Sequence, residues 1–351
     1  MATMVAAVLV AHGGPDALEL RHEMPVPRPA PGQVRVEVAA AGVNNTDVWT
    51  REGAYGAPGD PDAVVGWKGV PIAFPRVQGG DAAGRVVELG NGAPDALLGR
   101  RVLVDPIAYG PGEDPSEPAI EGVLGSEEDG AFAEYLCVPA DRVHDVTDSP
   151  LSDEQLACLP IAYGTATGML ERAALGAGDR VLVTGASGGV GIALVQLAAA
   201  RGAQVVAATS SRTGDAVLAA GASHVLVRDV APLEEQLAEA GPFAVIADVV
   251  GGPSFSALVG ALGTGGRLVT CGAVAGPVVE IDLRVLYLQR RTLIGSTMHT
   301  PSQFRRLIHD ARAGRLAPPV ARTYPLTEIH QAQQDFASGD RVGKLVLLPR
   351  A

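Results

Sequence analysis

Short runs in which hydrophobic and polar residues alternate fill the first 145 positions, and this period of two predicts β-strands. Clusters of Gly, Pro and Asp separate the runs. Two segments, Glu52–Pro75 and Asp105–Asp129, are too long and too rich in Gly, Pro and acidic residues for simple turns. We expect them to be loops that line or cover a site. The predicted strands are Val5–Val10, Gln33–Ala40, Gly84–Leu89, Arg101–Val104 and Phe132–Val138.

The pattern changes at Leu151. Ser152, followed by Gln155 three residues later, predicts a helix that opens with a capping box, and Gly164–Ala174 has a helical pattern too. Apolar strands and helices then alternate, which predicts a parallel, doubly wound sheet. The predicted strands are Arg180–Thr184, Gln204–Thr209, His224–Val227, Phe243–Val249, Gly266–Cys271 and Thr292–Gly295, and the predicted helices are Val190–Arg201, Gly214–Ala220, Leu233–Ala240 and Phe255–Leu262.

The end of the chain returns to the style of its beginning. Thr300–Pro301 predicts the cap and first position of a helix, a second helix follows, and Gly343–Leu348 predicts a final strand. The simplest architecture is therefore α/β, with a doubly wound parallel sheet (residues 146–299) inserted into a mostly-β domain (residues 1–145 and 300–351).

Charge and cysteine content narrow the class of partner. Lys and Arg number 27 against 39 Asp and Glu, a net charge of −12, which is the wrong sign for binding nucleic acid or an anionic membrane. Cys137, Cys158 and Cys271 are odd in number and far apart, so they form no fully paired disulfide framework and no CxxC metal motif. Free thiols, no basic amino-terminal region and no apolar span of ~20 residues predict a cytoplasmic protein.

The strongest local motif runs from Val181 to Gly191. A buried strand leads into Gly185, Gly188 and Gly191, and a helix follows. Glycines at this spacing allow a tight turn and bring backbone N–H groups and a helix N-terminus onto a pyrophosphate. The motif predicts dinucleotide binding; the alternative is that the glycines only permit close packing of helix and strand.

The next strand ends in Thr209-Ser210-Ser211-Arg212, where a site that prefers NAD usually has Asp or Glu. With no carboxylate to repel it and with two hydroxyls and a guanidinium available, we expect a 2′-phosphate to bind here, which favours NADP(H) over NAD(H). The alternative is an ordinary Ser/Thr turn.

A hydrolase is a competing interpretation of the same residues. Gly185-Ala-Ser187-Gly-Gly189 also fits a nucleophile elbow, and the segment at His12 resembles an oxyanion motif. This interpretation leaves Gly191 and the Ser-Ser-Arg turn unexplained, and the all-strand segment between the two motifs does not suit a hydrolase fold.

Several segments across the whole chain carry a family likeness: Gly13–Leu20, Ala41–Asp47, Gln78–Gly84, Gly130–Tyr135, Val181–Gly191 and Gly343–Val346. On these motifs the chain resembles the medium-chain dehydrogenase/reductase superfamily, in particular its zinc-independent quinone oxidoreductase-like branch. The resemblance implies a GroES-like catalytic domain (1–145 and 300–351) and a Rossmann NADP-binding domain (146–299).

The resemblance also bears on metals. Zinc-dependent alcohol dehydrogenases of that superfamily use a Cys, a Gly-His-Glu and another Cys as catalytic ligands. The matching positions here are Asn44, Gly80 and Ile161, which do not suit zinc. Asp105–Asp129, where those enzymes hold a structural zinc with four cysteines, contains no cysteine. We therefore expect neither metal.

Without a Lewis acid, the resemblance implies conjugate reduction, which needs an aligned cofactor and stabilisation of a developing enolate oxygen. The expected catalytic residues are Asn44, Asn45, Asp47 and Tyr55. Tyr55 resembles the catalytic tyrosine of enoyl-thioester reductases, but it is equally a candidate wall of the pocket. Asn45 and Asp47 either contact substrate or nicotinamide, or brace their own loop.

The expected cofactor site combines the glycine turn, the Ser-Ser-Arg turn and the strand ends at the ligand-binding edge of the sheet. Lys344 is included, with a solvated surface charge as its alternative. The full set is Thr165, Gly185, Ser187, Gly188, Gly189, Val190, Gly191, Ser210, Ser211, Arg212, Val250, Cys271, Gly272, Ala273 and Lys344.

Aromatic residues gather in and around the first long loop, which predicts a rim for a small hydrophobic or aromatic substrate. The expected pocket residues are Trp49, Trp67, Phe74 and Tyr109. The sequence thus predicts an NADPH-dependent, zinc-free reductase of quinones or α,β-unsaturated carbonyl compounds. The alternatives are an enoyl-thioester or biosynthetic tailoring reductase, and a non-catalytic NADPH-binding protein. The resemblance further implies a homodimer joined near Thr292–Thr297.

Overall fold

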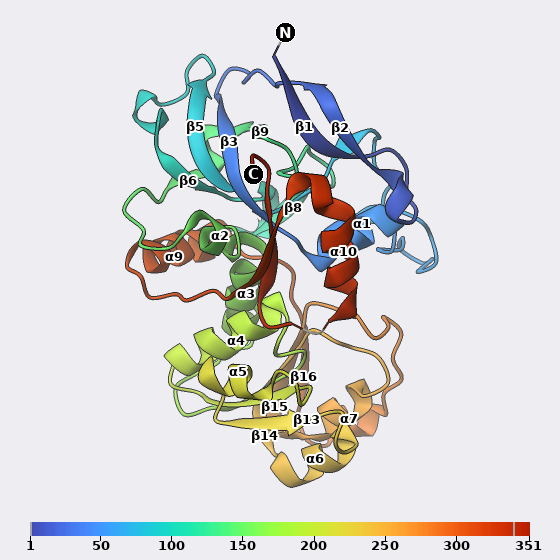
Figure 1. Ribbon diagram of the computed structural model, residues 1–351. Coiled ribbons are helices and arrows are strands. Elements are labelled where there is room, and N and C mark those ends of the chain that lie inside the picture. The colour runs from blue at the N-terminus through green and yellow to red at the C-terminus, as the bar shows by residue number, and fades with distance from the viewer. Residues whose placement is uncertain (1, 340) are drawn as a thin grey trace. The chain divides into compact units, whose positions relative to one another are not determined.

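The computed structural model describes residues 2–339 and 341–351, and these form two compact units (Figure 1). Unit 1 comprises residues 2–161, Thr300–Gly339 and Lys344–Ala351. Unit 2 comprises Ala162–His299 and residues 341–343. No helix among the described residues is both long and apolar enough to cross a membrane.

Unit 2 is built on a six-stranded parallel sheet with the strand order β13-β12-β11-β14-β15-β16. The chain moves outward from β11 on one side and then returns to continue from β14 on the other. The order therefore reverses between β11 and β14, where doubly wound folds bind their ligands at the carboxyl ends of the strands. The strands are β11 (Arg180–Val183), β12 (Gln204–Thr209), β13 (His224–Val227), β14 (Phe243–Asp248), β15 (Leu262–Thr270) and β16 (Thr292–Gly295).

Helices connect the parallel strands of unit 2 and cover the sheet. The side chains of its strands are therefore mostly apolar. Leu182, Ile246 and Leu268 on neighbouring strands belong to one buried cluster that includes residues of the helices. The predicted Rossmann-type fold is confirmed by this order and packing. The helices are α3 (Gly164–Arg172), α4 (Gly189–Ala200), α5 (Gly214–Ala219), α6 (Leu233–Ala240), α7 (Phe255–Gly260) and α8 (Leu283–Tyr287).

Unit 1 is mostly β-structure. A three-stranded sheet has the order β2-β1-β4, and a seven-stranded sheet has the order β10-β6-β5-β3-β18-β17, with β9 also paired to β3. Val36, Val38 and Leu347 lie in its main hydrophobic core. The strands are β1 (Thr3–Leu9), β2 (Leu18–Pro25), β3 (Gln33–Gly42), β4 (Arg76–Val77), β5 (Ala83–Leu89), β6 (Arg101–Val104), β9 (Tyr135–Pro139), β10 (Val143–Asp145), β17 (Val320–Pro325) and β18 (Lys344–Leu348).

Among the described residues, four α-helices complete unit 1. The predicted capping residues are in place, because Ser152 accepts a hydrogen bond from Gln155 N and Thr300 accepts one from Gln303 N. The helices are α1 (Asn45–Glu52), α2 (Asp153–Leu156), α9 (Pro301–Arg312) and α10 (Ile329–Ser338).

Two local predictions need correction. The segment Asp105–Asp129 is not simply a loop, because β7 (Ile107–Asp114) and β8 (Glu117–Val123) form an antiparallel hairpin within it. Register shifts in β7 accommodate its Gly and Pro residues. The Asn-Asn-Thr-Asp segment at position 44 begins a helix, α1, rather than a turn.

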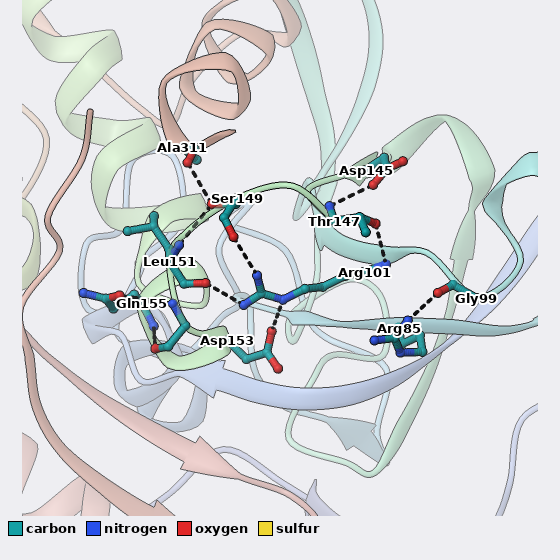
Figure 2. Close-up of polar contacts among 11 residues, drawn as sticks. Arg85, Gly99, Arg101, Asp145, Thr147, Ser149, Leu151, Asp153, Gln155 and Ala311 are labelled. Carbon is teal, nitrogen blue, oxygen red and sulfur yellow. Dashed lines mark hydrogen bonds and ion pairs between the residues drawn. The ribbon is translucent and has the colours of Figure 1, made fainter. Parts of the chain in front are cut away.

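The segment that follows residue 145 packs in unit 1, whose first stretch of chain runs to Ile161. Figure 2 shows that Arg101 holds this segment: its guanidinium donates to Ser149 O at 3.3 Å and Leu151 O at 2.7 Å, and it pairs with Asp153 at 2.5 Å. The Ser149 hydroxyl in turn donates to Ala311 O of α9 at 2.7 Å. These bonds place the boundary later than the predicted residue 145.

Candidate active site

The glycine turn between β11 and α4 has the geometry that its sequence predicts. Gly185 has a φ of +56°, which favours glycine, and a Cβ on Gly191 would lie 2.1 Å from Gly185 O. Gly188 is the N-cap of α4 and, as a glycine, has no side chain to cap the helix. The half-buried residues Ser187, Gly189 and Val190 complete the turn. The N–H groups of the first turn of a helix attract an anionic group, so this turn suits a pyrophosphate.

A buried carboxylate shapes the adjoining strand ends. Asp248, which is fully buried at the end of β14, accepts hydrogen bonds from the Thr184 hydroxyl at 2.6 Å, Val250 N at 3.1 Å and Gly251 N at 3.0 Å. It thereby fixes the loop that carries Val250 next to the glycine turn. The sequence does not predict this role for Asp248, because the role depends on the pairing of β11 with β14.

The other predicted residues of the sheet edge in unit 2 lie after β15 and in the first turn of α3. Cys271, Gly272 and Ala273 follow β15 and are half-buried, and a Cβ on Gly272 would lie 2.9 Å from Val249 O. Burial raises the pKa of the Cys271 thiol to about 12, so this thiol stays protonated. Thr165 is buried in the first turn of α3, near the sulfur of Met298.

The turn after β12 contains one contact that the sequence did not reveal. Both donors of Ser211, its N–H and its hydroxyl, bind the carboxylate of Asp229, at 2.8 Å and 2.6 Å. The Ser210 hydroxyl contacts that of Thr213 at 3.1 Å. Arg212 is exposed beside them.

In unit 1, the residues around Asn44 form a buried polar cluster. Asp47 accepts the Asn44 N–H at 2.7 Å and so braces the start of α1. Asn45 is half-buried at the first position of this helix. The Asn44 amide nitrogen donates to Asp81 Oδ2 at 2.9 Å and to Gly42 O at 3.2 Å. The Asn44 side chain is therefore committed to contacts inside unit 1.

Lys344 is part of this cluster and is not a solvated charge, since only 3% of it is exposed. Its ammonium lies 2.6 Å from Asp81 Oδ2 and donates to Asn44 Oδ1. Asp81 is fully buried, and its other oxygen accepts Ile161 N–H at 2.8 Å. A Cβ on Gly42 would lie 2.8 Å from Lys344 Cε, so glycine gives the lysine its space.

Burial perturbs two of the predicted catalytic groups. It raises the pKa of Asp47 from 3.8 to about 7, against the lowering effects of the Asn44 N–H and of Lys344. It also raises the pKa of Tyr55 well above its usual range, while a hydrogen bond to the Thr46 side chain acts in the opposite direction. Tyr55 is thus a phenol that stays protonated, next to a carboxyl that titrates near neutral pH.

The predicted aromatic rim is only partly one group. The Trp49 and Tyr55 rings meet edge to face at 5.7 Å, whereas Phe74 packs against the ring of His12 at 5.0 Å. Trp67, which lies between Tyr55 and Phe74 in the sequence, is half-buried. Tyr109, on β7, donates its hydroxyl to Asp105 at 3.3 Å.

Comparisons with known proteins agree over the whole length of the chain. A family described as "Alcohol dehydrogenase GroES-like domain" matches residues 30–148, and one described as "Zinc-binding dehydrogenase" matches residues 189–312. Quinone oxidoreductase of Homo sapiens is 27% identical over 98% of each chain. Acryloyl-coenzyme A reductase of Metallosphaera sedula is 31% identical over 97% of this chain and 98% of its own.

A crystal structure of a Sinorhizobium meliloti protein assigned to the alcohol dehydrogenases is 45% identical, with a TM-score of 0.94 over 99% of this chain and 97% of its own. The two curated relatives and this structure therefore each cover both units.

One of the matching descriptions names zinc, and the residues present do not fit it. Zinc takes sulfur, imidazole or carboxylate ligands. Among the residues that the structure describes, no three His, Cys, Asp or Glu side chains gather to hold a metal. Asn44 and Asp81 are instead bound to the Lys344 ammonium, and this positive charge would repel a metal ion.

Proposed function

The chain belongs to the medium-chain dehydrogenase/reductase superfamily, with the quinone oxidoreductases, and on that premise we propose that it reduces quinones or α,β-unsaturated carbonyl compounds with NADPH and without zinc. That it is an oxidoreductase follows from the family. The observation that carries the cofactor part of the proposal is the glycine turn between β11 and α4, where a Cβ at position 191 would lie 2.1 Å from Gly185 O, so the turn requires glycine there.

Within unit 2, the chain's own groups would bind the dinucleotide. The N–H groups of the first turn of α4 would bind its pyrophosphate, the loop fixed by Asp248 would border it, and the guanidinium of Arg212 would pair with a 2′-phosphate. When bound, the nicotinamide supplies the hydride. Each turnover then consumes one NADPH and one proton.

The donor set of unit 1 supports chemistry without a Lewis acid. Without a metal to polarise its oxygen, a simple alcohol or aldehyde is a poorer partner in hydride transfer. An electron-poor double bond or a quinone accepts hydride when hydrogen bonds stabilise the developing oxyanion. A small apolar acceptor is therefore the substrate class that these residues favour.

Tyr55 is the group proposed to meet that oxyanion. Its raised pKa keeps the phenol protonated, and the hydrogen bond to Thr46 orients its hydroxyl. Asn44 is less suited to contact substrate, because its amide already bonds to Lys344, Asp81 and Gly42. We assign Asn44 a role in holding the start of α1, and Asp47 a role in bracing it.

An enoyl-thioester is the second candidate substrate. The relative that supports it is the acryloyl-coenzyme A reductase, which is 31% identical over nearly the whole chain. The position of Tyr55 in the loop after α1 fits either acceptor class.

Steady-state NADPH oxidation by the full chain tests the proposal, with 1,4-benzoquinone, 9,10-phenanthrenequinone and crotonyl-CoA as acceptors. Turnover with a quinone supports the first candidate, and turnover with crotonyl-CoA alone supports the second. Tight NADPH binding without any turnover would replace both with a non-catalytic binding protein. Activity that disappears on dialysis against a chelator and returns with zinc would refute the zinc-free assignment.

We also propose a homodimer through the edge of the unit 2 sheet. β16 ends the strand order, and an exposed edge with apolar neighbours favours pairing with a second copy. Leu293 is 40% exposed on this edge, and Tyr287 and Leu288 just before it are 65% and 66% exposed. Light scattering should give twice the 35.8 kDa chain mass, and Leu293→Arg should halve it. Val230→Arg, beyond the opposite edge strand β13, should leave the dimer intact.

A further inference from the structure

The turn that should receive the 2′-phosphate already holds an anion from the chain itself. Ser211 follows β12, and Asp229 follows the neighbouring strand β13. The two oxygens of Asp229 accept the Ser211 N–H at 2.8 Å and the Ser211 hydroxyl at 2.6 Å. The two residues lie 18 positions apart in sequence, but their strands are parallel neighbours.

A pair of donors on one residue that grips two oxygens of an anion is the arrangement that also binds a phosphate. The Ser211 N–H and hydroxyl hold the pKa of Asp229 below its usual range, so this carboxylate is ionised at neutral pH. Both side chains are exposed, which makes the contact open to exchange with an anion from solution.

The other side chains of the turn bond to one another, so among these residues Ser211 is the one whose donors bind Asp229. The Thr213 hydroxyl bonds to that of Thr209 at 2.6 Å and to that of Ser210 at 3.1 Å. The Arg228 N–H donates to Thr209 O at 3.0 Å and ties the start of the Asp229 segment to the end of β12. The segment that carries Asp229 is therefore anchored beside the turn.

We propose that Asp229 determines the cofactor specificity of this site, because its carboxylate accepts the N–H and the hydroxyl of Ser211 and competes with the 2′-phosphate of NADPH for these two donors. This inference rests on the proposed function. NADPH must displace Asp229 from Ser211 or forgo that contact, and its phosphate also meets the negative charge. NADH carries no 2′-phosphate and avoids both costs. The chain therefore discriminates less strongly for NADPH than its Ser-Ser-Arg sequence suggests.

The test measures the Kd of NADPH and of NADH by nicotinamide fluorescence for the wild type and for Asp229→Asn. The substitution keeps the size of the side chain and removes its charge. We expect the Kd of NADPH to fall by about tenfold and that of NADH to change by less than about twofold. The fragments 2′,5′-ADP and 5′-AMP, measured in parallel, should show the same contrast, since they differ only in the 2′-phosphate.

Two further variants separate specificity from structure. Glu235→Gln, at an exposed position of α6, removes the same charge from unit 2 and should leave both Kd values unchanged. Ser211→Ala in the Asp229→Asn background removes the hydroxyl donor and keeps the backbone N–H, so it should reduce the gain for NADPH. Thermal melts of every variant establish that each one is folded, and Asp229→Ser provides a second neutral variant.

The outcomes distinguish the inference from the function on which it rests. A wild type that binds NADH more tightly than NADPH refutes the proposed cofactor, while a lower NADPH-to-NADH Kd ratio in Asp229→Asn still supports the role of Asp229. An unchanged or higher ratio in that variant overturns the role of Asp229, whichever cofactor the wild type prefers. If neither nucleotide binds, both proposals fall.

Discussion

Replacing Lys344 with methionine should strongly destabilise unit 1. The ammonium is 3% exposed and pairs with the fully buried Asp81 at 2.6 Å. Methionine fills much of the same space but leaves Asp81 charged and unpaired and deprives Asn44 Oδ1 of its donor. Breaking one partner of a buried pair costs about 3–5 kcal/mol, because the remaining charge keeps its desolvation penalty.

Urea unfolding followed by tryptophan fluorescence measures this loss. Trp49 and Trp67 are the two tryptophans of the chain, and both belong to unit 1, so the signal reports on the unit that is perturbed. With a slope of about 2 kcal/mol per molar urea, a loss of 4 kcal/mol moves the midpoint down by about 2 M.

The two lysines of the chain, Lys68 and Lys344, offer a matched control. Lys68 is exposed and donates to Glu121 O, so Lys68→Met should cost less than about 0.5 kcal/mol. The double variant Lys344→Met with Asp81→Asn removes both charges and should recover most of the lost stability. A Lys344→Met protein within 1 kcal/mol of the wild type, or a double variant no more stable than the single one, would refute the reasoning.

Three more predictions concern the two candidate sites. Burial raises the pKa of Asp47 from 3.8 to about 7, so the folded state binds this proton more tightly than the unfolded state; the resulting stability is complete below pH 3.8 and is lost as the pH rises to about 7. This loss of stability amounts to about 4 kcal/mol at most, and Asp47→Asn should remove it. If the urea midpoints of the wild type and of Asp47→Asn fall equally between pH 4 and 8, the prediction is wrong. Tyr55→Phe should lower kcat by about 100-fold with an unchanged KM for NADPH, and an unchanged kcat would leave Tyr55 a pocket wall. Gly191→Ala should weaken NADPH binding by more than about tenfold, since its Cβ would lie 2.1 Å from Gly185 O, whereas Gly260→Ala, with open space around it, should bind normally.

The fold was predictable where its signals are local. Alternating strands and helices with caps such as Ser152 and Thr300 gave the sheet of unit 2 and the helices that flank it. The hairpin of β7 and β8 was missed, because Gly, Pro and acidic residues disfavour strands and only cross-strand pairing reveals them. The helix α1 was missed too, although Asn44 and Asp47, three residues apart, carry a capping signal.

In the candidate sites, too, the features predictable from the sequence are those whose residues lie close together along the chain. The three glycines of the dinucleotide turn act on each other within seven positions, so their spacing is readable directly. The pairing of Lys344 with Asp81 spans 263 positions and depends on strand order, because β18 and β5, which follows Asp81, both pair with β3. The contact between Ser211 and Asp229 likewise depends on the neighbouring strands β12 and β13. Pairwise chemistry across strands carries no signature in a single sequence.

The position of β18 has a consequence for biosynthesis. This strand is the last of the described strands in sequence order, yet it lies between β3 and β17 in the sheet of unit 1. Domains fold as units while the chain emerges from the ribosome, amino terminus first. The strands and helices of unit 2 are complete once His299 has emerged, but β3 waits for its neighbour, and Asp81 for its counterion, until Lys344 is made. The unit that begins first in the sequence is thus the one whose native state is reached last.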